Sequence, residues 1–212
     1  MNRKNKLLKI KKSISKVEYL RLKDALELKS LKNLNSESKS VKFQQFRLLN
    51  IEVALTVLYH TGIRVSELSE IQICDIADAI FQNEFFIYQG KSKTTRSVTI
   101  SKNAVADFRK VFDSHLSEVD RNTYILRRWG NAKRGLAKRY IEKMLNKFIH
   151  EVLGERYSTH GFRKGLINDL IYHGHLMTEV QALIGHKHVS TTAIYVNELS
   201  EDTKSMLMNS VR

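Results

Sequence analysis

His160 and Arg163 combine an imidazole, which can move a proton near neutral pH, with a guanidinium, which can bind an anion through two parallel hydrogen bonds. The two residues lie three apart at the expected start of a helix, so they share one face near its positive N-terminal end. A phosphate bound there would also meet free backbone N–H groups. An isolated pair of this kind is more typical of a solvated helix surface, so its interpretation depends on the motifs that accompany it.

The pair lies in HGFR at residues 160–163, and two further motifs accompany it in a specific order: TGIRVSEL at 61–68 before it and LIGHKHVSTTAIYV at 183–196 after it. In their order and spacing they resemble the tyrosine recombinase family, also called the phage integrase family. The resemblance covers roughly residues 14–196. It implies a mainly α fold with a small antiparallel β-sheet (α+β), the catalytic core of DNA breaking-rejoining enzymes.

The resemblance also implies a set of catalytic residues, each of which has the residue type that the family pattern expects. The family's catalytic lysine sits on a hairpin after a glycine, which favours Lys91 after Gly90 and leaves Lys93 as the competitor. A slip of the hairpin by two residues would keep either lysine on the same face. The full set carried over from the family is Arg64, Lys91, His160, Arg163, His186 and the nucleophile Tyr195.

The chemistry of phosphodiester cleavage accounts for these residue types. A phenol with a pKa near 10 is a poor nucleophile, so its attack requires loss of its proton and neutralisation of the phosphate charge. Arg64 and Arg163 would stabilise the transition state, and His160 would accept the phenol proton. His186 would donate a hydrogen bond to the phosphate, while Lys91 would protonate the departing 5′ oxygen. This scheme needs no metal or other cofactor, and its 3′-phosphotyrosyl link implies rejoining as well as cutting.

Other residues compete for these roles. Tyr157 and Tyr172 are alternative nucleophiles, although Tyr172 lies in an apolar run and is more typical of a core or rim position. Six of the eight histidines lie between residues 150 and 188, so a metal site is an alternative. We expect instead that His173, His175 and His188 lie at the rim, with His188 adding a contact to a DNA phosphate.

The composition favours an intracellular protein that binds a polyanion. The 212 residues carry a formal net charge of +14, and 42% of them are hydrophobic, enough for one main folded domain. Cys74 is the single cysteine, so no intramolecular disulfide can form. Neither a signal peptide nor a membrane span is evident. We therefore expect a cytoplasmic, nucleoid-associated protein, without excluding an organelle genome as host.

A basic region interleaved with aromatic residues is the best candidate for tracking a DNA groove. Between Arg121 and Lys147 there are nine basic residues and one acid, Glu142. A solvated helix face is the competing interpretation for any single residue. The DNA-binding candidates are Lys93, Arg127, Arg128, Lys133, Arg134, Lys138, Arg139 and His188.

Hydrophobic patterning predicts mostly helices. One predicted β-hairpin, residues 85–89 and 97–101, is the only convincing strand signal. Ser15 with Glu18 and Thr178 with Gln181 form candidate capping boxes, and Ser158-Thr159 can cap the helix that begins near residue 160. The expected helices span residues 15–29, 46–59, 65–71, 136–153, 161–174, 178–185 and 190–196.

The predicted organisation is a flexible basic arm at residues 1–13, the catalytic domain at 14–196 and a tail at 197–212 that can dock on a neighbouring protomer. We expect the family's N-terminal core-binding domain to be missing, as in its short members that invert promoter segments. By resemblance, the partners are double-stranded DNA, a homotetramer formed on DNA and an accessory DNA-bending or directionality protein. A type IB topoisomerase-like nicking-closing enzyme and a non-catalytic DNA-binding regulator remain the alternative functions.

Overall fold

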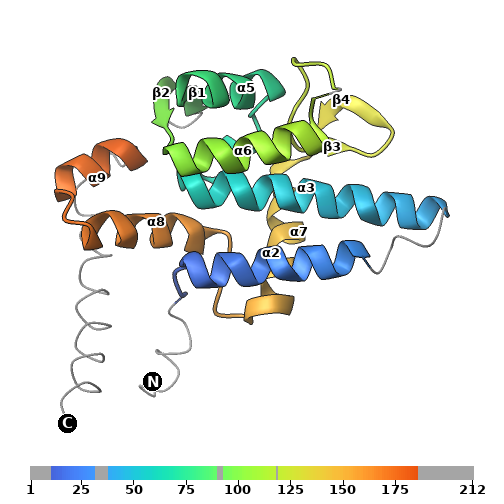
Figure 1. Ribbon diagram of the computed structural model, residues 1–212, viewed down its shortest axis with the longest axis horizontal. Helices are drawn as coiled ribbons and strands as arrows, with labels where there is room; N and C mark the ends of the chain where they lie inside the picture. Colours follow the sequence, from blue (N-terminus) through green and yellow to red (C-terminus); the bar gives the residue numbers. More distant parts are fainter. Residues whose placement is uncertain (1–10, 32–37, 90–92, 118, 186–212) are drawn as a thin grey trace, which may run out of the picture.

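The computed structural model describes residues 11–31, 38–89, 93–117 and 119–185, and it confirms a mainly α fold with small antiparallel sheets (Figure 1). The predicted helix at 190–196 and the tail at 197–212 lie outside these ranges. The helices are α2 Lys16–Leu31, α3 Lys39–Thr61, α4 Val65–Leu68, α5 Ile73–Gln82, α6 Lys102–His115, α7 Lys138–Leu153, α8 His160–Tyr172 and α9 Met177–Ile184. The strands are β1 Glu84–Gln89, β2 Thr94–Thr99, β3 Arg127–Arg128 and β4 Asn131–Gly135.

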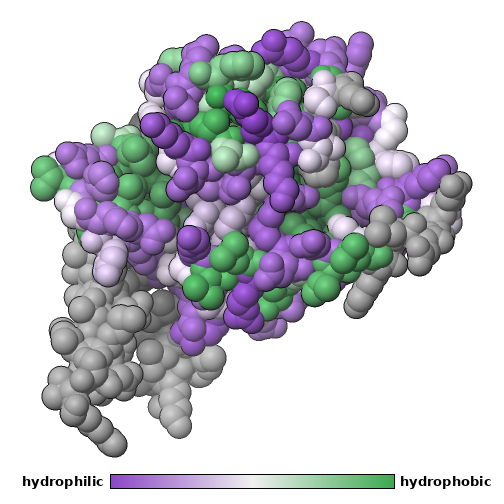
Figure 2. Space-filling view, in the orientation of Figure 1, coloured by the Kyte–Doolittle hydropathy of each residue, from purple (hydrophilic) through white to green (hydrophobic). Residues whose placement is uncertain are grey.

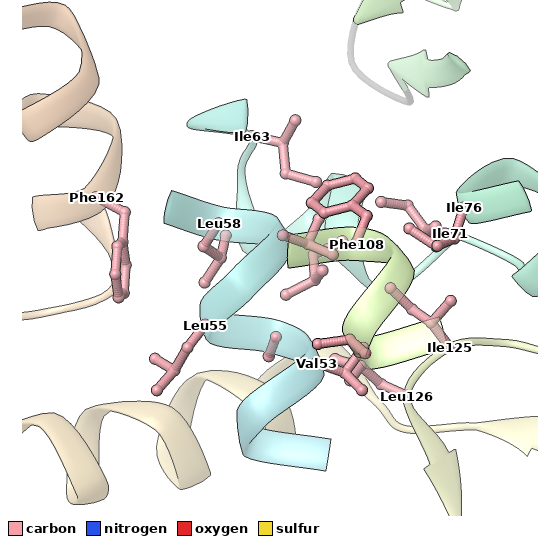
Figure 3. Packing of buried hydrophobic residues seen from close by; sticks show 14 of the residues in the cluster. Val53, Leu55, Leu58, Ile63, Ile71, Ile76, Phe108, Ile125, Leu126 and Phe162 are labelled. Atoms are coloured by element: carbon pink, nitrogen blue, oxygen red, sulfur yellow. The ribbon is translucent and has the colours of Figure 1, made fainter. Parts of the chain in front are cut away.

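Helix α3 runs through the middle of the molecule, with α6 alongside it and α8 near one end (Figure 1). From Phe46 to Tyr59 this helix is apolar on nearly every face, which suits a central position, and Val53 to Leu58 are buried. Phe162 of α8 approaches α3 from one side, while Phe108 of α6 packs on the other (Figure 3). The helix begins earlier than predicted, at Lys39, because the Ser38 side chain caps it by accepting from the Val41 N–H at 3.3 Å.

Helix α2 begins where the capping box predicted. The Ser15 N–H donates to the Glu18 carboxylate at 3.0 Å, and the Ser15 hydroxyl contacts the same carboxylate. The core-facing residues of α2 are Tyr19, Leu22 and Leu26. Three other apolar residues of this helix, Val17, Leu20 and Leu28, are exposed.

The two small sheets are both antiparallel hairpins. Strand β1 pairs with β2 in a register that places Gln89 opposite Thr94. The pairing of β3 with β4 corrects the expectation that 85–101 holds the only strands. The second hairpin escaped prediction because β3 has two residues and NAKRG in β4 lacks β-branched or aromatic side chains.

Helices α7, α8 and α9 lie where the periodicity predicted, but two predicted caps are wrong. Thr159 occupies the N-cap of α8 without a capping bond from its side chain. At α9 the Glu179 carboxylate accepts from the Leu176 N–H at 3.0 Å, so the helix begins before the predicted Thr178–Gln181 box. Gly154 ends α7 with a positive φ of 93°, as expected of a C-terminal glycine.

The end of the predicted basic arm is fixed rather than flexible. The Lys12 N–H donates to the Arg156 carbonyl at 2.9 Å, and the Ile14 N–H donates to the Gly161 carbonyl at 2.9 Å. This segment lies so close to α8 that a Cβ at Gly165 would overlap the carbonyl of Ile14. Gly165 is therefore required by packing, although glycine within a helix is intrinsically unfavourable.

Candidate active site

A tight turn after α3 presents Arg64. Gly62 ends α3 with a φ of 57°, a left-handed conformation that favours glycine. A Cβ on Gly62 would also lie 3.0 Å from Leu166 and 3.5 Å from the Cα of Arg163, so the turn packs directly on α8. Arg64 follows at the N-cap of α4, where its side chain is 43% exposed.

A buried carboxylate orients Arg64. The side chain of Glu67 is only 5% exposed, and its oxygens accept from the Arg64 backbone N–H at 2.8 Å and from Arg64 Nη1 at 2.9 Å. Glu67 also accepts from Arg96 Nη2 at 3.4 Å. Sequence analysis assigned no function to Glu67, although its position three residues after Arg64 is the spacing of a capping box.

Arg96 connects three segments of the site. Its Nη2 reaches Glu67 on α4, and its Nη1 donates to the Leu183 carbonyl on α9 at 3.1 Å. Arg96 itself belongs to β2, the second strand of the hairpin whose turn carries Lys93. Loss of hydration on burial lowers the Arg96 pKa, while the Glu67 charge opposes that shift. The sequence gives no signal for the long-range contact with Leu183.

Arg163 is the most buried cation of the site. It is 2% exposed, donates from Nη1 to the Gly62 carbonyl at 3.1 Å, and donates from Nη2 to the Ile184 carbonyl at 2.6 Å. These bonds join α8 to the turn before Arg64 and to the last residue of α9. A guanidinium suits this position because its planar fork can bond two carbonyls at once. Phosphate binding by Arg163 would add to these bonds or replace one of them.

His160 opens α8 and completes the group. Partial burial lowers its pKa below the usual 6.5, and the positive charges of Arg163, Arg64 and Lys164 lower it further. The structure therefore brings together Arg64, His160 and Arg163, which are up to 99 residues apart in sequence. A neutral imidazole beside two guanidinium groups can accept a proton next to a bound anion.

The remaining predicted catalytic residues, Lys91, His186 and Tyr195, lie outside the described residues, as does His188. Lys93 is exposed at the end of the hairpin turn, with a φ of 52°. The choice between Lys91 and Lys93 therefore stays a prediction. Gly185 ends α9 with a φ of 71°. It lies between Ile184, whose carbonyl accepts from Arg163, and His186.

Of the DNA-binding candidates in the basic region between Arg121 and Lys147, one is buried and the others face solvent. Arg127 is 8% exposed with its guanidinium 5.8 Å from the Phe46 ring, which argues against a DNA contact by this side chain. A groove of about 420 Å³ separates α4 from the second hairpin and is lined by Ser69, Glu70 and Tyr124 together with basic residues of β3 and β4. The exposed candidates are Arg128, Lys133, Arg134, Lys138 and Arg139.

The competing residues lie apart from this arrangement. Tyr172 is 82% exposed at the end of α8, so it is a rim rather than a core residue. The Tyr157 ring contacts the Lys12 ammonium at 5.6 Å, and burial raises the Tyr157 pKa. His173 and His175 are exposed. Within the described ranges, no three His, Cys, Asp or Glu side chains are placed to hold a metal ion.

A protein-family model described as the phage integrase family matches residues 21–202. The chain belongs to this family. Among its relatives, the tyrosine recombinase XerD of Rhizobium meliloti (strain 1021) is 29% identical over 178 residues, which are 82% of this chain and 55% of that protein. The chain spans about half the length of the curated relatives that it matches.

Solved structures share the fold of this phage integrase family member. The crystal structure of XerA recombinase matches with a TM-score of 0.64 at 21% identity, over 96% of this chain and 67% of that one. XerH site-specific recombinase bound to its difH substrate matches with a TM-score of 0.55 at 18% identity, over 92% and 52%. None of the helices that the structure describes is both long and apolar enough to cross a lipid bilayer.

Proposed function

We propose that this protein is a site-specific DNA recombinase that cleaves and rejoins DNA through a 3′-phosphotyrosine on Tyr195. The observation that carries the proposal is the convergence of Arg64, at the N-cap of α4, with His160 and Arg163 of α8 in a chain that belongs to the phage integrase family. Further support comes from XerH, a relative in fold that was crystallised on its difH substrate in a pre-cleavage complex.

In the proposed reaction, the Tyr195 oxygen attacks the scissile phosphorus and the bond to the 5′ oxygen breaks. Neutral His160 takes the phenol proton, and Lys91 gives a proton to the departing 5′ oxygen. Arg64, held by Glu67, faces the phosphate together with Arg163 and neutralises charge in the transition state. A 5′ hydroxyl from another strand reverses the steps, so no external energy source is needed.

The proposed partner is double-stranded DNA, contacted by the exposed basic residues beside the groove between α4 and β4. Family membership supports assembly of four protomers on two DNA sites and makes an accessory DNA-bending or directionality protein an expected partner. Because the substrate is DNA, we place the activity at the nucleoid.

The test uses supercoiled plasmid that carries the native flanking sequence of the gene, incubated with the full chain and quenched in SDS. We expect a covalent protein–DNA adduct that Tyr195→Phe abolishes and that Tyr172→Phe, a matched exposed tyrosine, leaves unchanged. Relaxed plasmid without exchanged or inverted segments would favour a nicking-closing enzyme. Salt-sensitive binding with no adduct would favour a non-catalytic regulator, and either result would overturn the proposal.

A further inference from the structure

Helix α2 is apolar on two opposite sides. One side faces the core through Tyr19, Leu22 and Leu26. The opposite side faces solvent, and hydrophobic patches run along α2 in the space-filling view (Figure 2). The exposed apolar side chains are Val17 (65% exposed), Leu20 (48%), Leu28 (60%) and Leu31 (55%).

These four side chains form one stripe. At 3.6 residues per turn they fall within about 80° of one another around the helix, centred opposite the core-facing side. Exposed Asp24 lies in the middle of this stripe, so the apolar side chains form two pairs, Val17 with Leu20 and Leu28 with Leu31. Scattered apolar residues are normal on a protein surface, whereas a set gathered on one helix face marks an interaction site. The core of this domain does not account for the stripe, because α2 already packs on α3 and α7 through its other side.

The stripe is symmetric about Asp24. Leu20 and Leu28 lie four residues on either side of Asp24, and Val17 and Leu31 lie seven residues on either side. If the helix is turned end for end about Asp24, each of these apolar positions therefore falls on another apolar position. A surface with this property is self-complementary under a two-fold axis, which is the requirement for an isologous dimer.

We infer that α2 is a self-association surface on which a second copy of this chain pairs antiparallel, with the two-fold axis at Asp24. In this pair Val17 packs beside Leu31 of the other copy, and Leu20 packs beside Leu28 of the other copy. The inference does not depend on the proposed recombinase activity, because none of the catalytic residues lies on α2.

The charges that flank the stripe favour the antiparallel direction. The exposed face of α2 carries Lys16 and Arg21 in its first half and Asp24 and Glu27 in its second half. Antiparallel pairing about Asp24 places Arg21 of each copy beside Glu27 of the other and sets the two helix dipoles antiparallel, while the two Asp24 carboxylates meet at the axis. Parallel pairing would also bring the two Asp24 carboxylates together, and in addition it would place Arg21 beside Arg21 and Glu27 beside Glu27.

A surface of four apolar side chains per copy is small for a protein–protein interface, so the dimer should be weak and depend on concentration. Sedimentation velocity of the full chain without DNA over a concentration series measures this. We expect Leu20→Asp to abolish association and Phe81→Asp, which changes an 81% exposed side chain on α5, to leave it unchanged. A wild-type chain that stays monomeric throughout, or association that survives Leu20→Asp, would overturn the inference.

Cysteine crosslinking tests the geometry independently of affinity. In a Cys74→Ser background, Asp24→Cys places two thiols at the two-fold axis, so we expect disulfide-linked dimers under mild oxidation. Val17→Cys is the matched variant: its two thiols would be 14 residues apart along the pair, roughly 21 Å, which no disulfide can span. Equal crosslinking at both positions would indicate a parallel pair, and no crosslinking at either position would exclude pairing; both outcomes contradict the inference.

Discussion

Replacing Glu67 by alanine removes the one carboxylate that holds both Arg64 and Arg96. The Arg96 side chain is 12% exposed, so Glu67→Ala leaves a largely buried guanidinium without its opposite charge. Removing one partner of a buried ion pair costs about 3–5 kcal/mol. The Arg64 side chain is 43% exposed, so its share of the loss is only about 0–1 kcal/mol.

We therefore expect Glu67→Ala to lower the free energy of unfolding by about 3 kcal/mol, at the lower end of that range because the Arg96 contact is long, 3.4 Å. For a domain of this size the loss corresponds to a decrease in Tm of roughly 9 °C. Urea unfolding followed by circular dichroism measures the free energy, and an unchanged m-value shows that the same surface unfolds.

The matched control is Glu70→Ala, which removes an exposed acid three residues later and should change stability by less than about 0.5 kcal/mol. In a double-mutant cycle, Arg96→Met combined with Glu67→Ala should cost less than the sum of the single changes, because both charges are removed. The reasoning is refuted if Glu67→Ala costs no more than Glu70→Ala, or if the two losses simply add.

Three further predictions concern packing, pH and DNA binding. Gly165→Ala should lower the free energy of unfolding by about 2 kcal/mol in urea titrations, because the new methyl overlaps Ile14, although helix propensity alone favours alanine by about 1 kcal/mol. Burial lowers the pKa of His60 below 6.5, so the unfolded state binds more protons at this residue than the folded state does. The free energy of unfolding should therefore fall as pH drops below 6.5, and it should fall less in His60→Gln. Urea titrations at pH 7.5 and 5.5 measure this loss, and an equal loss in the two proteins would contradict the prediction. Arg134→Ala should reduce the slope of log Kd against log salt concentration by roughly 0.9, measured by fluorescence anisotropy with duplex DNA. Arg109→Ala, which changes an exposed arginine on α6, is the control. An unchanged slope in Arg134→Ala, or an equal reduction in Arg109→Ala, would show that Arg134 does not contact DNA.

Much of the fold was predictable because local signals and packing agree. The continuous apolar run of α3 predicted a buried helix, and the apolar residues of α7 recur with the helical period up to Gly154. Helices α5 and α6 were not predicted. The second hairpin was missed because β3 and β4 are short and polar. Pairing of such strands depends on tertiary context, which a single sequence does not display.

At the site, the resemblance to the family predicted Arg64, His160 and Arg163 as catalytic residues, and the structure brings these three residues together. Sequence reasoning did not identify Arg96 as the bridge between α4 and α9, since its partner Leu183 is 87 residues away and bonds through a backbone carbonyl. Nor did it assign a buried side to α2, because periodicity alone does not tell which side of a helix is buried.

Mass spectrometry of the covalent adduct tests the central claim most directly. The full chain is incubated with supercoiled DNA that carries its native flanking sequence, quenched in SDS, and digested with nuclease and protease. The account predicts a peptide carrying a nucleotide attached through its 3′ phosphate to Tyr195, and no such peptide from Tyr195→Phe. A nucleotide on a different tyrosine, or none on DNA that the protein demonstrably binds, would contradict it.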